Sequence, residues 1–107
     1  MRKRSHFDRV YRKGDRWSSD YIIYHIIDKE DGPARIGLVT PNSLGSAVVR
    51  NRVKRVVREA FRKDKKKFGS CDFIVRPKEK ASTLTNDELR KEFLAGFERA
   101  QEKAEGS

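Results

Sequence analysis

The chain has 107 residues, enough for one domain with one modest hydrophobic core. It carries 26 Lys and Arg against 16 Asp and Glu, so its net charge is +10. No apolar run approaches the roughly 20 residues of a membrane span, and the start MRKRSHF lacks the apolar core of a signal peptide. A single cysteine, Cys71, excludes an intramolecular disulfide, and with two His it forms no metal-ligand cluster. We therefore expect one cytoplasmic domain over residues 1–107 that binds no metal itself.

A short helix is predicted first, because residues 5–8 (Ser-His-Phe-Asp) match a capping box. It runs to about residue 12 and places Phe7, Val10 and Tyr11 on one side. Val10 is expected to pack against a sheet. Phe7 and Tyr11 are either core residues as well or stacking platforms for single-stranded bases, since cations lie close to them in the sequence. These cations are Arg4, Arg12 and Lys13.

Strands follow the glycine at position 14. Residues 15–18 predict a short edge strand, and the β-branched and aromatic run at 21–27 predicts a longer one with two apolar faces. After a turn at 30–33, residues 35–40 predict a strand that pairs antiparallel with 21–27 across the short loop. Pro41 ends it.

The longest predicted helix, residues 46–68 with Ser46 as N-cap, has two different faces. Its apolar stripe consists of Val49, Val53, Val56, Val57, Ala60 and Phe61. The opposite face carries Asn51, Arg55, Arg58 and Arg62, with Lys54, Arg50 and Arg52 beside them. Residues 50–67 alone have a balance of +8.

Many basic helices only present a solvated face and bind no partner. Solvated helices usually interleave both signs of charge, whereas Glu59 is the one acidic residue between Arg50 and Arg62. Most cations there are arginines, which bind phosphate in a bidentate manner, and Asn51 adds a donor and an acceptor. The sequence therefore favours a nucleic-acid-binding helix.

A further strand at 71–76, a polar connection at 77–83 and a final helix complete the chain. Thr85 and Glu88 form a capping box for this helix, and Leu89, Phe93, Phe97 and Ala100 form its apolar stripe. Residues 103–107 are expected to fray. The order αβββαβα indicates an α+β fold, an α/β sandwich with about four strands and three helices. By default the strand–helix–strand crossover would be right-handed.

The segment VVRNRVKRVVREAFR, with the upstream IGL and LGSA and the N-terminal HFDRVYRKG, resembles the bacterial ribonuclease P protein family. The family signature is the RNR segment, here Arg50-Asn51-Arg52, followed by Lys54, Arg55 and Arg58. The resemblance spans nearly the whole chain. It implies an α/β sandwich whose crossover through the RNR helix is left-handed, against the general rule.

The resemblance also implies a function and two surfaces. Such proteins bind a large catalytic RNA and help it remove the 5′ leader from precursor tRNA, one protein per RNA. The RNR helix, Arg62 included, would face the catalytic RNA. A cleft between the first helix and the sheet would take the single-stranded leader through Phe7, Tyr11, Ile23 and His25, with Arg4, Arg12 and Lys13 nearby.

Two positions depart from the family pattern. His25 replaces an aromatic residue that is common there, and residues 40–43 (Thr-Pro-Asn-Ser) lack a usual Lys-Lys pair. The loss of two phosphate contacts should weaken RNA binding and its salt dependence.

The sequence holds no carboxylate cluster, paired His or activated nucleophile. We therefore expect an accessory subunit of an endoribonuclease, with catalysis by the RNA and Mg²⁺ held mainly by the RNA. A ribosomal-type RNA-binding protein and a self-sufficient nuclease remain as alternatives. A helix–turn–helix is excluded, because strands precede the basic helix.

Overall fold

Three helices and four strands follow one another in the predicted order in the computed structural model, which describes residues 4–106. The helices are α1 (Arg4–Lys13), α2 (Ala47–Lys63) and α3 (Asn86–Gly106). The strands are β1 (Asp15–Ser18), β2 (Ile22–Asp28), β3 (Arg35–Leu38) and β4 (Cys71–Pro77). Three 3₁₀ turns lie between them, η1 (Asn42–Leu44), η2 (Lys65–Phe68) and η3 (Glu79–Thr83). The predicted α+β sandwich is confirmed.

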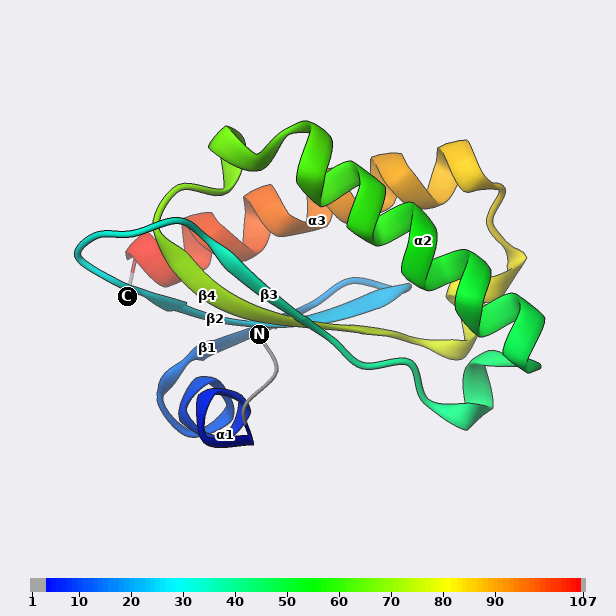
Figure 1. Ribbon diagram of the computed structural model, residues 1–107, viewed down its shortest axis with the longest axis horizontal. Helices are drawn as coiled ribbons and strands as arrows, with labels where there is room; N and C mark the ends of the chain where they lie inside the picture. Colours follow the sequence, from blue (N-terminus) through cyan, green and yellow to red (C-terminus); the bar gives the residue numbers. More distant parts are fainter. Residues whose placement is uncertain (1–3, 107) are drawn as a thin grey trace.

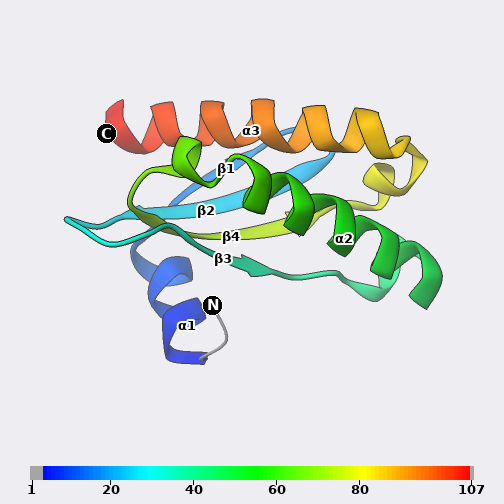
Figure 2. The same cartoon turned by 45° about the horizontal axis from the view of Figure 1, so that its top comes forward.

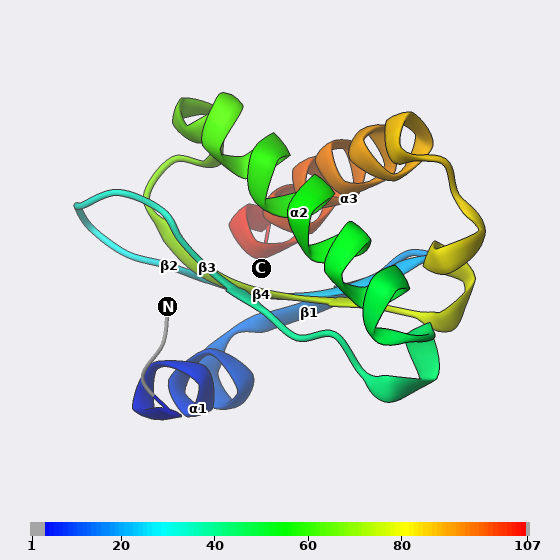
Figure 3. The same cartoon turned by 45° about the vertical axis from the view of Figure 1, so that its right-hand side comes forward.

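The strands form one sheet with helices on both faces (Figure 1). α2 and α3 cover one face, and α1 lies alone on the other, as the view in Figure 3 also shows. The alternation in β2 explains this arrangement. Ile22, Tyr24 and Ile26 are fully buried beneath the helical layer, whereas the residues between them are only half-buried on the α1 side.

β2 and β3 run in opposite directions, as predicted, but the predicted pairing between them is wrong. The strand order is β1-β2-β4-β3, so β4 is inserted between them, antiparallel to β2 and parallel to β3. The reason is burial. β4 is buried from Cys71 to Val75, and its face toward α2 and α3 is apolar, which suits a central strand, whereas the shorter β3 is only partly buried and takes the edge. The loop after β2 therefore crosses two strand spacings, about 10 Å, instead of one.

The crossover from β3 through α2 to β4 is left-handed, as the family resemblance implies. β3 and β4 run in the same direction, and α2 returns in front of the sheet as seen in Figure 2, with β4 above β3. The general preference for right-handed crossovers therefore does not hold here. This handedness places α2 over the β3 edge of the sheet and α3 over the β1 side.

The core is built by the predicted apolar stripes of the two long helices. Val53, Val56, Val57, Ala60 and Phe61 of α2 are buried, as are Leu89, Phe93, Phe97 and Ala100 of α3. Aromatic rings join them to the sheet. Phe68 stacks on Phe73 of β4 at a centroid distance of 5.6 Å and lies 4.5 Å from Phe97. Phe68 belongs to η2, which follows Lys63, so the single helix predicted to residue 68 ends five residues earlier.

The N-caps predicted from the sequence are present at α2 and α3 but not at α1. Ser46 Oγ accepts the Val49 N–H (3.4 Å), and the Thr85–Glu88 box is closed by hydrogen bonds of 2.9 and 3.1 Å. Arg4 is already helical, so Ser5 lies inside α1 and is not its N-cap. α3 remains helical to Gly106, through most of the segment expected to fray, and Ser107 lies outside the described residues.

Close packing of α3 on the sheet depends on one glycine. A Cβ at Gly96 would lie 2.9 Å from Cε2 and Cζ of Tyr24, which is closer than packed carbon atoms approach. The Tyr24 hydroxyl donates to the Phe93 carbonyl (2.9 Å), so the buried ring and its polar group are both accommodated by α3.

Candidate nucleic-acid interface

The outer face of α2 presents the predicted row of polar and cationic side chains. Asn51, Arg55, Arg58 and Arg62 are exposed, and Lys54 is half-buried beside them. With Glu59 they line one shallow hollow along the helix. Because the opposite face of α2 is packed into the core, this row is fixed in direction and can meet several phosphates of one backbone.

Arg50 and Arg52, the two arginines of the RNR segment, are instead bound within the protein. The Arg52 guanidinium donates to the carbonyls of Ser82 (3.1 Å) and Leu84 (3.3 Å) and to Asn86 Oδ1 (2.7 Å). These oxygens lie where η3 leads into α3. Arg52 therefore fastens α2 to the start of α3, and an RNA phosphate would have to compete with these bonds.

Arg50 donates to Asn42 Oδ1. Asn42 belongs to residues 40–43, the segment that lacks the Lys-Lys pair of the family. The Arg50 guanidinium thus brings a positive charge to that segment from the first turn of α2.

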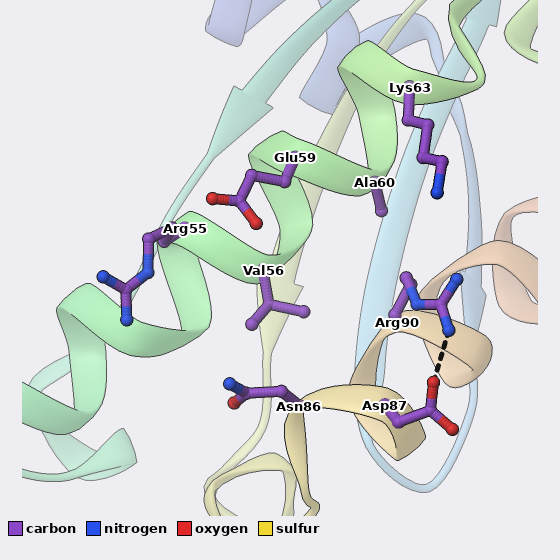
Figure 4. A pocket seen from close by; sticks show the side chains of 8 residues that line it. All are labelled: Arg55, Val56, Glu59, Ala60, Lys63, Asn86, Asp87 and Arg90. Atoms are coloured by element: carbon purple, nitrogen blue, oxygen red, sulfur yellow. Dashed lines mark hydrogen bonds and ion pairs between the residues drawn. The ribbon is translucent and has the colours of Figure 1, made fainter.

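A second hollow separates α2 from α3 and has a different character (Figure 4). Val56 and Ala60 lie between the helices, whereas Arg55 and Lys63 lie at its ends. Carboxylates are part of its lining. Glu59 comes from α2, and Asp87 of α3 is paired with Arg90. The mixed charge makes this hollow a poorer site for a polyanion than the outer face of α2.

On the other face of the sheet, the apolar and aromatic residues of α1 differ in how deeply they are buried. Val10 is fully buried, as predicted, whereas Phe7 is half-buried and Tyr11 is 41% exposed. The Tyr11 ring meets His25 of β2 edge-on, with centroids 4.8 Å apart and planes at 73°. An exposed ring held by such a contact can accept a stacked base. Arg4, Arg12 and Lys13 are exposed on the same helix.

His25 lies beside Tyr11 on the face of the sheet that α1 covers, and we call this face the sheet floor. Ile23 lies on the same face of β2, two residues before His25. Burial and the nearby Arg16 lower the pKa of His25 below its ordinary value. Its Nδ1 is buried without a hydrogen-bond partner among the described residues. The ring is therefore neutral at physiological pH and offers an uncharged aromatic surface.

Two cations that the sequence analysis did not include lie on this floor. Arg16 of β1 pairs with His25, and Arg76 of β4 pairs with Ile23; both arginines are exposed. Directly paired residues share one face of a sheet. Alternation along each strand predicts the face, but only the strand order shows that β1 and β4 flank β2.

On the same face of the sheet, one buried carboxylate pairs with two further cations. Asp72 is 2% exposed and accepts from Arg35 through Nε (2.9 Å) and Nη2 (2.6 Å), and from Lys29 Nζ (3.0 Å). Burial alone would raise the pKa of Asp72, but the hydrogen bonds from Arg35 and Lys29 lower it to about 2. Arg35 Nη1 also lies 3.3 Å from His6 Nδ1 of α1, so the network ties α1 to the sheet.

Residues 4–106 hold no group of three His, Cys, Asp or Glu that could bind a metal ion. Cys71 is buried, and burial raises the pKa of its thiol to about 12, so the thiol is protonated at neutral pH. None of the described helices is long and apolar enough to span a membrane.

Comparison with known sequences gives one consistent result. The family model described as Ribonuclease P matches residues 1–101. A ribonuclease P protein component of Bacillus cereus (strain B4264) is 33% identical over 102 residues, covering 94% of this chain and 89% of the relative. One from Bacillus anthracis (strain A0248) is 32% identical and covers 94% and 86%.

Solved structures agree with the sequence matches. The RNase P protein of Staphylococcus aureus superposes with a TM-score of 0.87 at 26% identity, over 94% of this chain and 93% of that chain. The RNase P protein of Thermotoga maritima gives a TM-score of 0.82 at 27% identity, over 92% and 94%. The match therefore extends over more than nine tenths of the chain.

Proposed function

Because the chain belongs to the ribonuclease P protein family, we propose that it binds the catalytic RNA through α2 and the 5′ leader of precursor tRNA through the α1 side of the sheet. Members of this family act with the RNA subunit in processing the 5′ end of tRNA, as part of an endoribonuclease. The assignment of the two surfaces to their RNAs is the proposed part.

The observation that carries the proposal is the outer face of α2. An exposed row is formed by Asn51, Arg55, Arg58 and Arg62, on a helix whose other face is buried from Val53 to Phe61. The row adds nothing to the core, and its mutual repulsion opposes folding, so an anionic partner is its best physical explanation. A polyanionic RNA with regularly spaced phosphates fits it.

Support for leader binding comes from the α1 side of the sheet. Tyr11 and His25 offer neutral aromatic surfaces, and Arg16 and Arg76 offer phosphate contacts on the same floor. Stacking on such rings tolerates any base. A leader of variable sequence needs this kind of recognition.

We further propose that the RNA subunit performs the cleavage with Mg²⁺ held mainly by RNA oxygens. The described protein residues do not fit a site for this ion, and the protein's contribution is to offset phosphate repulsion and to position the leader. One protein per RNA in the cytoplasm is the expected assembly.

Reconstitution tests this function. The chain is combined with a bacterial ribonuclease P RNA at low Mg²⁺ and given precursor tRNA. We expect cleavage at the mature 5′ end, dependent on both components. Specific protection of ribosomal RNA but not of ribonuclease P RNA would favour a ribosomal-type protein, and cleavage by the protein alone would favour a self-sufficient nuclease.

A further inference from the structure

A groove joins the two proposed RNA surfaces around the β3 edge of the sheet. It has a volume of about 470 Å³, and α1, β3, α2 and η2 all contribute to it. Its apolar lining consists of Phe7, Ile36, Leu38 and Phe61. The volume falls within the roughly 300–1,000 Å³ of small-molecule sites, so a nucleotide can be accommodated.

Three cations, Arg58, Arg62 and Lys65, complete the lining. All three are exposed, and no carboxylate is among the residues that line this groove. The α2–α3 hollow, in contrast, includes Glu59 and Asp87. An apolar floor beside unopposed cations is complementary to one nucleotide, with the base on the floor and the phosphate at the cations.

Continuity with the two surfaces indicates which RNA strand lies there. Phe7 belongs to both the groove and the α1 side of the sheet, whereas Arg58 and Arg62 belong to both the groove and the outer face of α2. The proposed function places the leader at α1 and the catalytic RNA at α2. The bond to be cut is at the catalytic RNA, so the leader must cross from α2 to α1, and the groove lies on that route.

We propose that this groove binds a leader nucleotide located between the cleavage site and the nucleotides stacked at Tyr11. The inference rests on the proposed function and adds a subsite to it. Lys65 is the residue that distinguishes the subsite, because it lies in η2, outside the RNR helix. Lys66, its exposed neighbour, carries the same charge and does not line the groove.

The test compares Lys65→Ala with Lys66→Ala in the reconstituted holoenzyme. Affinities are measured for mature tRNA and for precursors with leaders shortened one nucleotide at a time. Lys65→Ala should weaken precursor binding about fivefold, with mature tRNA unaffected, as expected for one lost phosphate contact. Lys66→Ala should change precursor binding by less than about twofold.

The subsite and the leader cleft at Tyr11 are distinguished by the leader length at which each alanine variant begins to weaken binding. The effect of Lys65→Ala should appear at a shorter leader than the effect of Tyr11→Ala. The proposal that the groove binds a leader nucleotide would be overturned by equal effects of the two lysine variants. It would also be overturned if Lys65→Ala weakened binding of the catalytic RNA alone. If Lys65→Ala has no effect while Tyr11→Ala does, the groove is wrong and the leader cleft stands; if neither has an effect, the proposed leader binding fails as well.

Discussion

Single side chains on α2 differ in what surrounds their charge, and this difference predicts their roles. Arg55 and Arg58 are exposed on the outer face, and within residues 4–106 neither makes a hydrogen bond or an ion pair through its side chain. Arg99 is equally exposed on α3, where the face is mixed in sign. These residues form a matched set for binding experiments.

Arg55→Ala and Arg58→Ala should each weaken binding of the catalytic RNA by roughly 1 kcal/mol and lower the salt slope by about 1. The physical reason is the loss of one phosphate contact and its released counterion. Filter binding over a range of salt concentrations measures both quantities. Arg99→Ala serves as control, and an equal loss with this variant would mean that only net charge matters.

Tyr11 tests the leader cleft, because its ring is exposed and held against His25. Tyr11→Ala should weaken precursor tRNA binding by about 1–3 kcal/mol but leave mature tRNA unchanged. Tyr11→Phe should be nearly neutral, since the ring makes the contact. A variant that melts well below the parent, or binds both RNAs equally poorly, would identify Tyr11 as a packing residue.

Because of Asp72, the free energy of unfolding should fall as the pH is lowered into the acid range. Its pKa in the folded protein, about 2, lies below the ordinary value, so its stabilising effect is complete above about pH 5 and is lost as pH falls through 4 towards 2. Asp72→Asn should cost about 2–3 kcal/mol at pH 7, because Arg35 and Lys29 lose their partner. Urea unfolding at pH 7 and pH 3 measures this, and the variant should show the smaller difference between the two pH values.

The exposed Asp87 is the control for this experiment. It pairs with Arg90 and Lys91 on the surface of α3, where ion pairs contribute little. Asp87→Asn should therefore keep the parent's stability at pH 7. If Asp72→Asn is equally harmless, the buried network does not hold α1 and the sheet together.

At the scale of elements, the angle between α2 and α3 is fixed by more than apolar packing. The half-buried Arg52 reaches from α2 to three oxygens at the η3–α3 corner. A planar guanidinium can serve several acceptors at once, which a lysine ammonium does less well. Arg52 thus directs the outer face of α2.

Arg52→Ala should destabilise the fold by about 2 kcal/mol, since the carbonyls of Ser82 and Leu84 lose charged donors. Arg52→Lys should recover only part of this. Urea unfolding gives the stability, and the salt slope for catalytic-RNA binding should stay closer to the parent's than that of Arg55→Ala. Parent-like stability with a slope lowered by about 1 would instead make Arg52 a direct phosphate ligand.

At the scale of the whole molecule, the sheet lies between the cations of α1 and those of α2. Residues 50–67 carry a balance of +8, distributed over α2 and the following turn η2. Because few carboxylates lie nearby, the folded state concentrates repulsion that the unfolded chain spreads out. Anions that bind the folded surface should relieve this cost.

Adding about 10 mM sulfate or pyrophosphate should raise the melting temperature by several degrees, because ligands that bind only the folded state stabilise it. Differential scanning calorimetry with chloride at matched ionic strength provides the control. An Arg58→Gln/Arg62→Gln double variant should show a smaller shift. Equal shifts in sulfate and chloride would mean general screening instead of an organised anion site.

The sequence by itself determined the features that depend on neighbours along the chain. Spacing of apolar residues predicted α2, α3 and their buried stripes, and short motifs predicted the caps at Ser46 and Thr85. The same periodicity separated the cationic row of α2 from its core face. These signals are local, because each turn of a helix or pair of strand residues repeats the same geometry.

Tertiary structure alone decided which distant segments became neighbours. The buried β4 lies at the centre of the sheet, between β2 and β3, which prevents the expected hairpin and places Arg76 beside Ile23. The fold also brought the oxygens of η3 to Arg52 and set Phe7 across the β3 edge from Lys65. Such contacts depend on how all elements share one core, and no spacing along the chain encodes that competition.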